Sequence, residues 1–225
     1  MHWGVFHGKY ANKRKDRILI LGESHHVSTD KDVATNKDPG KRATYSTQSV
    51  LEEYLQNYNT CTGKGRKASF QFFDKIVRTF GIDPETSRSE FWDRVYFGNY
   101  IDVLCGIGDN FAKSQIKADE NRQKYNDQLF AFVNDHNISH IFCFSILSYK
   151  NLPSLVSGEE EECTELGKQG KCNVYLYRCL YKAGIARNNT SIVLENDLKV
   201  FGIRHPSAKG GYPLDLFVKE VSGKI

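Results

Sequence analysis

Two short apolar runs constrain the fold most, because each of them stops abruptly at a cluster of polar residues. Residues 17–26 read RILILGESHH, an aliphatic run that ends at Gly22 and is followed by Glu23, Ser24, His25 and His26. Residues 198–212 read LKVFGIRHPSAKGGY, an apolar run followed by His205, Ser207, Lys209, Gly210 and Gly211. Apolar runs of this length bounded by glycine and polar residues are typical of buried strands. Loops at the carboxyl ends of parallel strands form the ligand crevice of an open sheet, so we expect both clusters to face one site.

The rest of the chain predicts an α/β fold. Further strands are expected at 94–100 (RVYFGNY) and at 139–146, whose apolar centre suggests burial on both faces. Helices are expected at 46–58, 70–80 and 125–136, where apolar residues recur every three or four positions. Strands separated by helices predict a short central parallel sheet covered on both faces, a three-layer α/β/α domain. Residues 150–172 have little to bury, and we expect them to form an inserted surface loop.

Length and charge set further bounds. The 225 residues, 40% of them hydrophobic, fit a single domain spanning 1–225. No stretch approaches 18 apolar residues and the start lacks a secretory signal, which predicts a cytoplasmic protein without membrane contact. We also expect a monomer. The net charge of +4 permits a polyanionic partner. Basic clusters occur at 13–17, 37–42 and 64–67, although each of them could equally be a solvated face.

Six cysteines are present without any C-x-x-C pair, at positions 61, 105, 143, 163, 172 and 179. We expect reduced, individually packed thiols. An iron–sulfur or zinc site that uses Cys163, Cys172 and Cys179 is the alternative.

Three groups of side chains are candidates for chemistry. His205 precedes a proline, which restricts its backbone to extended geometry, and it could act as a fixed hydrogen-bond donor or acid. Glu23 to His26 place a carboxylate, a hydroxyl and two imidazoles within four residues. Asn99 ends the strand predicted at 94–100 and carries both a donor and an acceptor, as reading a nucleobase edge requires. His205 could instead be a structural histidine, and Asn99 a residue that forms a turn.

Together these motifs resemble the uracil-DNA glycosylase superfamily. GESHH is similar to the family's loop after the first strand, WDRVYFGNY to the strand that bears the base-reading asparagine, HIFCFS to the third strand, and FGIRHPSAKGGY to the histidine-bearing loop. The resemblance implies a three-layer α/β/α fold, a flipped-out nucleotide and cleavage of the bond between base and sugar, with DNA as partner. It gives His205 the role of steadying the departing base, and it gives Asn99 the role of reading the base edge.

Other roles follow from the same resemblance and from departures from it. Ser24 stands where the best-known branch has its water-activating aspartate, so Glu23 is the nearest carboxylate, and His26 stands where that branch has a pocket-closing tyrosine. These departures favour a modified or damaged pyrimidine over ordinary uracil, in repair or in phage defence. Phosphate contacts are expected from His25, Ser207, Lys209, Gly210 and Gly211, together with the basic early loops.

Two other functions remain open. GESHH also resembles the G-E-x-x-H signature of erythromycin-esterase-like hydrolases, in which Glu23 and His26 would act on a small-molecule ester. A noncatalytic DNA-binding relative is the third interpretation, favoured by Ser24. We expect no cofactor and no metal, although Glu23, His25, His26 and His205 could in principle ligate a transition metal.

Overall fold

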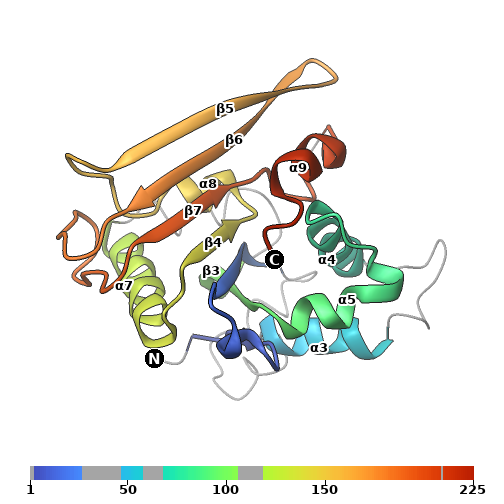
Figure 1. Cartoon of the computed structure of the whole chain (residues 1–225), viewed down its shortest axis with the longest axis horizontal. Coiled ribbons are helices and arrows are strands. Elements are labelled where there is room, and N and C mark those ends of the chain that lie inside the picture. Colours follow the sequence, from blue (N-terminus) through green and yellow to red (C-terminus); the bar gives the residue numbers. More distant parts are fainter. Residues whose placement is uncertain (1–2, 27–46, 58–67, 106–118, 209) are drawn as a thin grey trace.

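In the computed structural model of the chain, the described residues are 3–26, 47–57, 68–105, 119–208 and 210–225. Within them, seven strands form one sheet in the order β1-β3-β2-β4-β7-β6-β5 (Figure 1). The strands are β1 (Phe6–His7), β2 (Ile18–His26), β3 (Tyr96–Cys105), β4 (His140–Cys143), β5 (Glu160–Gln169), β6 (Cys172–Tyr181) and β7 (Leu198–Gly202). The predicted α/β class is confirmed.

The sheet has a parallel centre and antiparallel edges. Strands β3, β2, β4 and β7 are parallel neighbours, whereas β1 pairs with β3, and β6 with β7, in antiparallel fashion. The expectation of a parallel sheet is therefore correct for these four strands, but the whole sheet is mixed. The antiparallel edge arises because only Gly170 and Lys171 separate β5 from β6, and a two-residue turn can join only antiparallel strands. Gly170 has φ +61°, in the left-handed region that such turns require.

Part of the segment 150–172, which was expected to be a surface loop throughout, forms strand β5. Its side chains alternate little in polarity, and those of 160–163 are exposed, so the sequence lacks the apolar pattern of a strand. Backbone pairing with β6 stabilises β5 instead, over nine residue pairs from Glu160↔Leu180 to Gln169↔Cys172. The hairpin lies at the edge of the sheet, beyond β7 (Figure 1).

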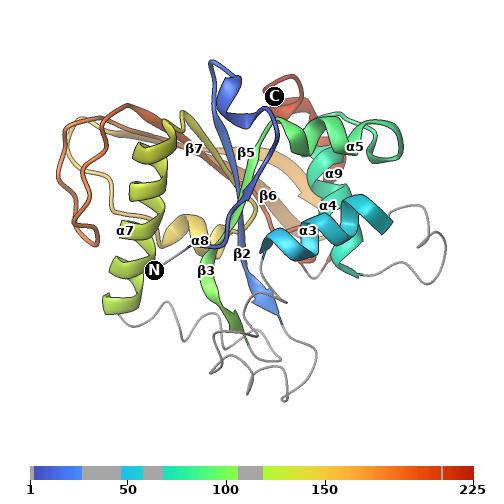
Figure 2. The same cartoon turned by 90° about the horizontal axis from the view of Figure 1, so that it is seen from below.

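Helices cover both faces of the sheet. The described helices are α3 (Thr47–Asn57), α4 (Ala68–Thr79), α5 (Pro84–Asp93), α7 (Asp119–His136), α8 (Ile146–Lys150) and α9 (Leu214–Val221), with a short 3-10 helix, η1 (Ala11–Lys13). Helices α7 and α8 lie on one side, and α3, α4, α5 and α9 on the other (Figure 2). The predicted helices at 46–58, 70–80 and 125–136 are confirmed within one or two residues at most boundaries, except that α7 begins earlier. None of the described helices has the length and apolarity needed to cross a membrane.

Alternation along the strands divides the interior into two hydrophobic cores. Leu19, Leu21 and Ile141 belong to the core under α7, whereas Ile20 and Phe142 belong to the core under α4 and α9. Because successive strand residues point to opposite faces, one apolar run supplies both cores. Residues 141–144 are all buried, as predicted, and the domain has three layers.

Candidate functional site

The strand order reverses at β2, which lies between β3 and β4. At such a reversal the connections leave on opposite sides of the sheet and open a crevice at the carboxyl ends. Here β4 pairs with β2 only as far as Leu21↔Cys143, after which the Phe144 N–H donates to the Leu21 carbonyl at 2.8 Å. The Ile203 N–H likewise donates to the Cys143 carbonyl at 2.8 Å. Strands β2, β4 and β7 are thus hydrogen-bonded in line at the edge from which the candidate residues emerge.

Glu23 and Ser145 meet across this reversal. The Ser145 hydroxyl donates to Glu23 Oε2 at 2.6 Å, and the same hydroxyl oxygen accepts the Ser148 N–H at 3.1 Å as the N-cap of α8. Since the Ser148 N–H can only donate, the Ser145 hydroxyl hydrogen is committed to the carboxylate. Glu23 is half-buried, and the Ser145 hydroxyl that holds its side chain is buried.

The GESHH segment belongs to strand β2 and is not the polar loop that the sequence suggested. β2 continues to His26 because β3 runs beside it, from Gly22↔Asn99 to His26↔Cys105, with a register shift between Ser24 and His25. Backbone pairing with β3 thus replaces the pairing lost where β4 ends. Ser24 is half-buried in this stretch, while the side chains of His25 and His26 lie outside the described part of the chain.

Asn99 is buried within β3, whereas the sequence predicted that it would end a strand. Its Nδ2 donates to Thr47 Oγ1 at 3.3 Å, at the start of α3. On the neighbouring strand Gly22 leaves room for it, since a Cβ at position 22 would lie 2.2 Å from Asn99 Oδ1. The Trp3 indole also donates to the Asn99 carbonyl at 2.9 Å. Asn99 is therefore held at its side chain by Thr47 and at its backbone carbonyl by Trp3. Because it pairs with Gly22, its side chain lies on the face of the sheet opposite to that of Glu23.

His205 lies in a tight turn after β7. The Ala208 N–H donates to the His205 carbonyl at 2.9 Å, and Lys75 of α4 donates to the Pro206 carbonyl at 2.8 Å. The Ser207 N–H donates to His205 Nδ1 at 3.1 Å. A backbone N–H cannot accept, so Nδ1 is the acceptor and neutral His205 carries its proton on Nε2. The imidazole also lies against the ring of Phe72, with the ring centroids 5.2 Å apart.

The remainder of this loop returns to α4 at Tyr212. The Tyr212 and Thr79 hydroxyl oxygens are 2.7 Å apart and hydrogen-bonded, and burial raises the pKa of Tyr212. Between these anchors Gly210 and Gly211 are exposed and have φ values of +87° and +86°, which favour glycine. Ser207 is exposed, and Lys209 lies outside the described residues. Two glycines with exposed backbone suit the predicted phosphate contact.

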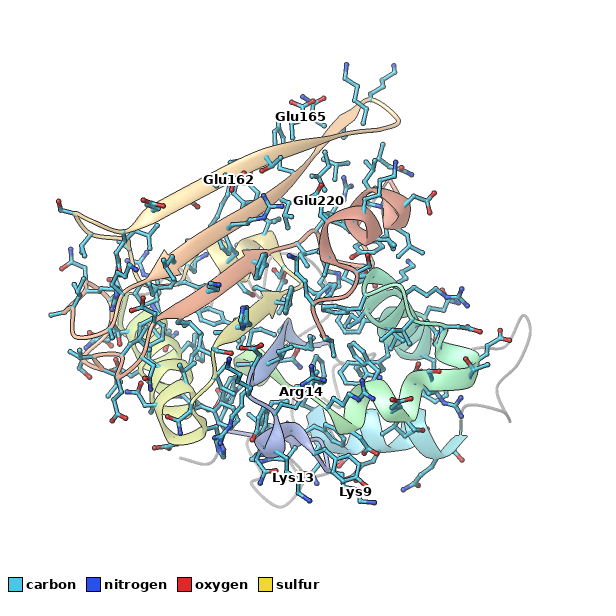
Figure 3. All side chains as sticks on the ribbon, in the orientation of Figure 1. Lys9, Lys13, Arg14, Glu162, Glu165 and Glu220 are labelled. Atoms are coloured by element: carbon cyan, nitrogen blue, oxygen red, sulfur yellow. The ribbon has the colours of Figure 1, made fainter. Side chains whose placement is uncertain are left out.

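The basic cluster at 13–17, from which a DNA contact was predicted, lies at the end of the sheet opposite to the carboxyl ends of β2 and β3 (Figure 2). Figure 3 shows Lys9, Lys13 and Arg14 around η1, and Figure 2 shows η1 at the end of β2 opposite to the carboxyl ends of β2 and β3. From Ile18 to Glu23 the strand spans roughly 17 Å. The side chains of this cluster are exposed or half-buried, as expected for a solvated face. The clusters at 37–42 and 64–67 lie outside the described residues.

The cysteine pattern does not form the alternative metal site. On the β5–β6 hairpin Cys163 pairs with Tyr177 and Cys172 pairs with Gln169, which places Cys172 roughly 20 Å from Cys163 along the strands. Burial raises the pKa of Cys143 and of Cys179, so both are neutral thiols at pH 7. Among the described residues no group of three or more His, Cys, Asp or Glu side chains is placed to hold a metal ion. The side chains of His25 and His26, which could in principle ligate a metal, lie outside the described residues.

Four contributing residues were not identified from the sequence: Ser145, Thr47, Phe72 and Trp3. Ser145 had a signal, because a serine between an apolar strand and a short apolar segment is typical of a helix N-cap. The contact of Thr47 with Asn99 depends on packing between distant segments and has no local signal. No family model and no curated protein matches this sequence, so the function must be inferred from the site itself.

Proposed function

We propose that the protein is a DNA glycosylase that hydrolyses the N-glycosidic bond of a flipped-out, modified or damaged pyrimidine and leaves an abasic site. The observation that carries this proposal is the hydrogen bond from the Ser207 N–H to His205 Nδ1. It makes Nε2–H a fixed donor, at the same edge of the sheet as the carboxylate of Glu23. A fixed donor and a fixed carboxylate are the two groups that glycosidic cleavage uses.

The chemistry assigns a role to each group. As the bond between C1′ and the base nitrogen breaks, its electron pair leaves with the base and the sugar gains oxocarbenium character. The Nε2–H of His205 stabilises the negative charge on the departing base. Glu23 stabilises the sugar cation and orients the water that adds to C1′, and the proton that this water loses neutralises the departed base anion. Because Ser145 engages Oε2 of Glu23, we assign Oε1 to the water.

Asn99 supports the same proposal in a narrower way. Its amide donates to Thr47 and has room beside Gly22, and an amide held in one orientation can distinguish a donor from an acceptor on a base edge. Extrusion of the target base costs a few kcal/mol, which is smallest for a damaged, mismatched or unpaired base.

The test is base release from oligonucleotides that carry uracil, thymine mismatches, or hydroxymethylated or glucosylated pyrimidines, each scored by strand cleavage at the abasic site. We expect release of at least one modified pyrimidine, retained in the presence of a chelator and lost in Glu23→Gln. Activity abolished by the chelator and restored by zinc would contradict the metal-free mechanism. Salt-sensitive DNA binding without release of any base would favour the noncatalytic relative. Ester hydrolysis without DNA binding would favour the esterase.

A further inference from the structure

A groove lined by two tyrosines lies beside the carboxyl ends of β4 and β7. It has a volume of about 240 Å³ and is lined by Ile146, Asn173, Val174, Tyr175, Tyr177 and Arg204. None of these residues has a role in the proposed cleavage. The groove is large enough for a nucleobase, but too small for the larger ligands that fill pockets of 300 Å³ and more.

Two residues of the groove are neighbours in sequence of residues in the candidate site. Ile146 follows Ser145, the residue that holds Glu23, and Arg204 immediately precedes His205. A Cβ at Gly210 would lie 3.5 Å from Arg204 Nη2, so the guanidinium lies next to the glycine turn of the His205 loop. A ligand in the groove would therefore be a close neighbour of the nucleotide being cleaved.

The groove wall formed by β6 is aromatic. Tyr175 and Tyr177 are two positions apart on the strand and so face the same side, with ring centroids 6.3 Å apart. Lys150 Nζ lies 5.7 Å from the centroid of Tyr177. Aromatic rings flanked by cations are the usual platform for unpaired bases, because every base has a face that can stack while its phosphate approaches a cation.

The groove carries charges of both signs. Arg204 supplies a cation beside Tyr175, since the β6–β7 register pairs Tyr177 with Gly202 two positions earlier on β7. Asn173 donates to Glu165 Oε2 at 3.3 Å and to the Tyr175 hydroxyl at 3.2 Å. Figure 3 shows Glu165 on β5, the outer strand of the hairpin, where the strand register pairs it with Tyr175. Its exposed carboxylate would repel the second phosphate backbone of a duplex, whereas Arg204 supplies a cation for the phosphate of one strand.

We propose that the groove binds an unpaired nucleotide next to the target, with its base on Tyr175 and Tyr177 and its phosphate at Arg204, and that the enzyme therefore prefers single-stranded DNA. This inference rests on the proposed glycosylase function for its choice of ligand. It assigns a substrate class to the same site.

The test compares binding of a fluorescently labelled single-stranded DNA of about 11 nucleotides with binding of the same sequence as a duplex. Loss of base stacking typically weakens binding about 5- to 150-fold, so we expect Tyr175→Ala to bind the single strand within this range more weakly and the duplex almost unchanged. Tyr175→Phe keeps the ring and should bind nearly as wild type. The control is Tyr10→Ala, because Tyr10 is 41% exposed and lies on η1's side of the molecule, and it should have no effect.

The outcomes separate this inference from the function on which it rests. Single-strand binding by Tyr175→Ala within twofold of wild type, or an equal loss on the duplex, would overturn the groove even if bases are released. Ring-dependent single-strand binding without release of any base would support the groove and contradict the glycosylase.

Discussion

Removal of the Ser145 hydroxyl tests the contact that holds the candidate carboxylate. In Ser145→Ala two bonds are lost at once, the donation to Glu23 at 2.6 Å and the acceptance of the Ser148 N–H. Loss of a serine cap costs about 1 kcal/mol, and a hydrogen bond to a charged group contributes about 1.5–3 kcal/mol. Because Glu23 is only half-buried, we expect a total loss of about 2–3 kcal/mol in the free energy of unfolding.

A double-mutant cycle with Glu23→Ala separates these two contributions. The cap is lost equally in Ser145→Ala with and without Glu23, so it cancels, and the remaining coupling between the residues should be about 1–2 kcal/mol. The free energies come from urea titrations of the wild type, both single variants and the double variant. A coupling below about 0.4 kcal/mol would show that Ser145 does not hold Glu23, and the assignment of Glu23 to the water would lose its structural basis.

Three further predictions concern the scaffold. Arg187→Ala should lower the free energy of unfolding by about 3–5 kcal/mol, because Arg187 and Glu159 form a salt bridge with fully buried side chains. Lys182→Ala, in the exposed pair with Asp197, is the control and should cost about 1 kcal/mol or less by the same urea titration. Burial lowers the pKa of His136 and of His140, with Lys199 contributing at His140, so the unfolded chain binds more protons than the folded chain on acidification. Denaturant midpoints should therefore fall as the pH decreases from about 7.5 through 6.5 toward the lower pKa values of the folded state. Midpoints that rise on acidification would contradict this. Gly22→Ala should lower the free energy of unfolding by about 1–3 kcal/mol and broaden the range of bases released, because the new Cβ at position 22 would displace the Asn99 amide. An equal loss of stability in an Asn99→Ala background would refute that cause.

Local patterns in the sequence were enough to predict the helices and the parallel centre of the sheet. The residues at 141–144 and 18–21 are apolar at every position, which is the pattern of strands buried on both faces, and the structure uses them in this way. The positions of Glu23 and His205 toward the carboxyl ends of β2 and β7 could also be anticipated, because polar residues follow both apolar runs.

The polarity of side chains did not predict where the strands end. Glu23 to His26 and the residues after Asn99 stay in strands because the backbones of β2 and β3 pair with each other, and this pairing is independent of side-chain type. The same holds for β5, whose exposed glutamates gave no sign of a strand. Contacts between distant segments, such as Thr47 with Asn99, depend on how the helices pack and leave no local signal.

The central claim is that His205 donates from Nε2 to a base that becomes negatively charged only as the bond breaks. The most direct test is single-turnover base release by His205→Ala on the best substrate, measured together with DNA affinity. We predict a loss on the order of 100- to 1,000-fold in rate with nearly unchanged affinity, because such a donor contributes little to ground-state binding. His7→Ala, on β1 beside the amino end of β3, is the matched control and should release the base as wild type. Release by His205→Ala as fast as by the wild type would contradict the account.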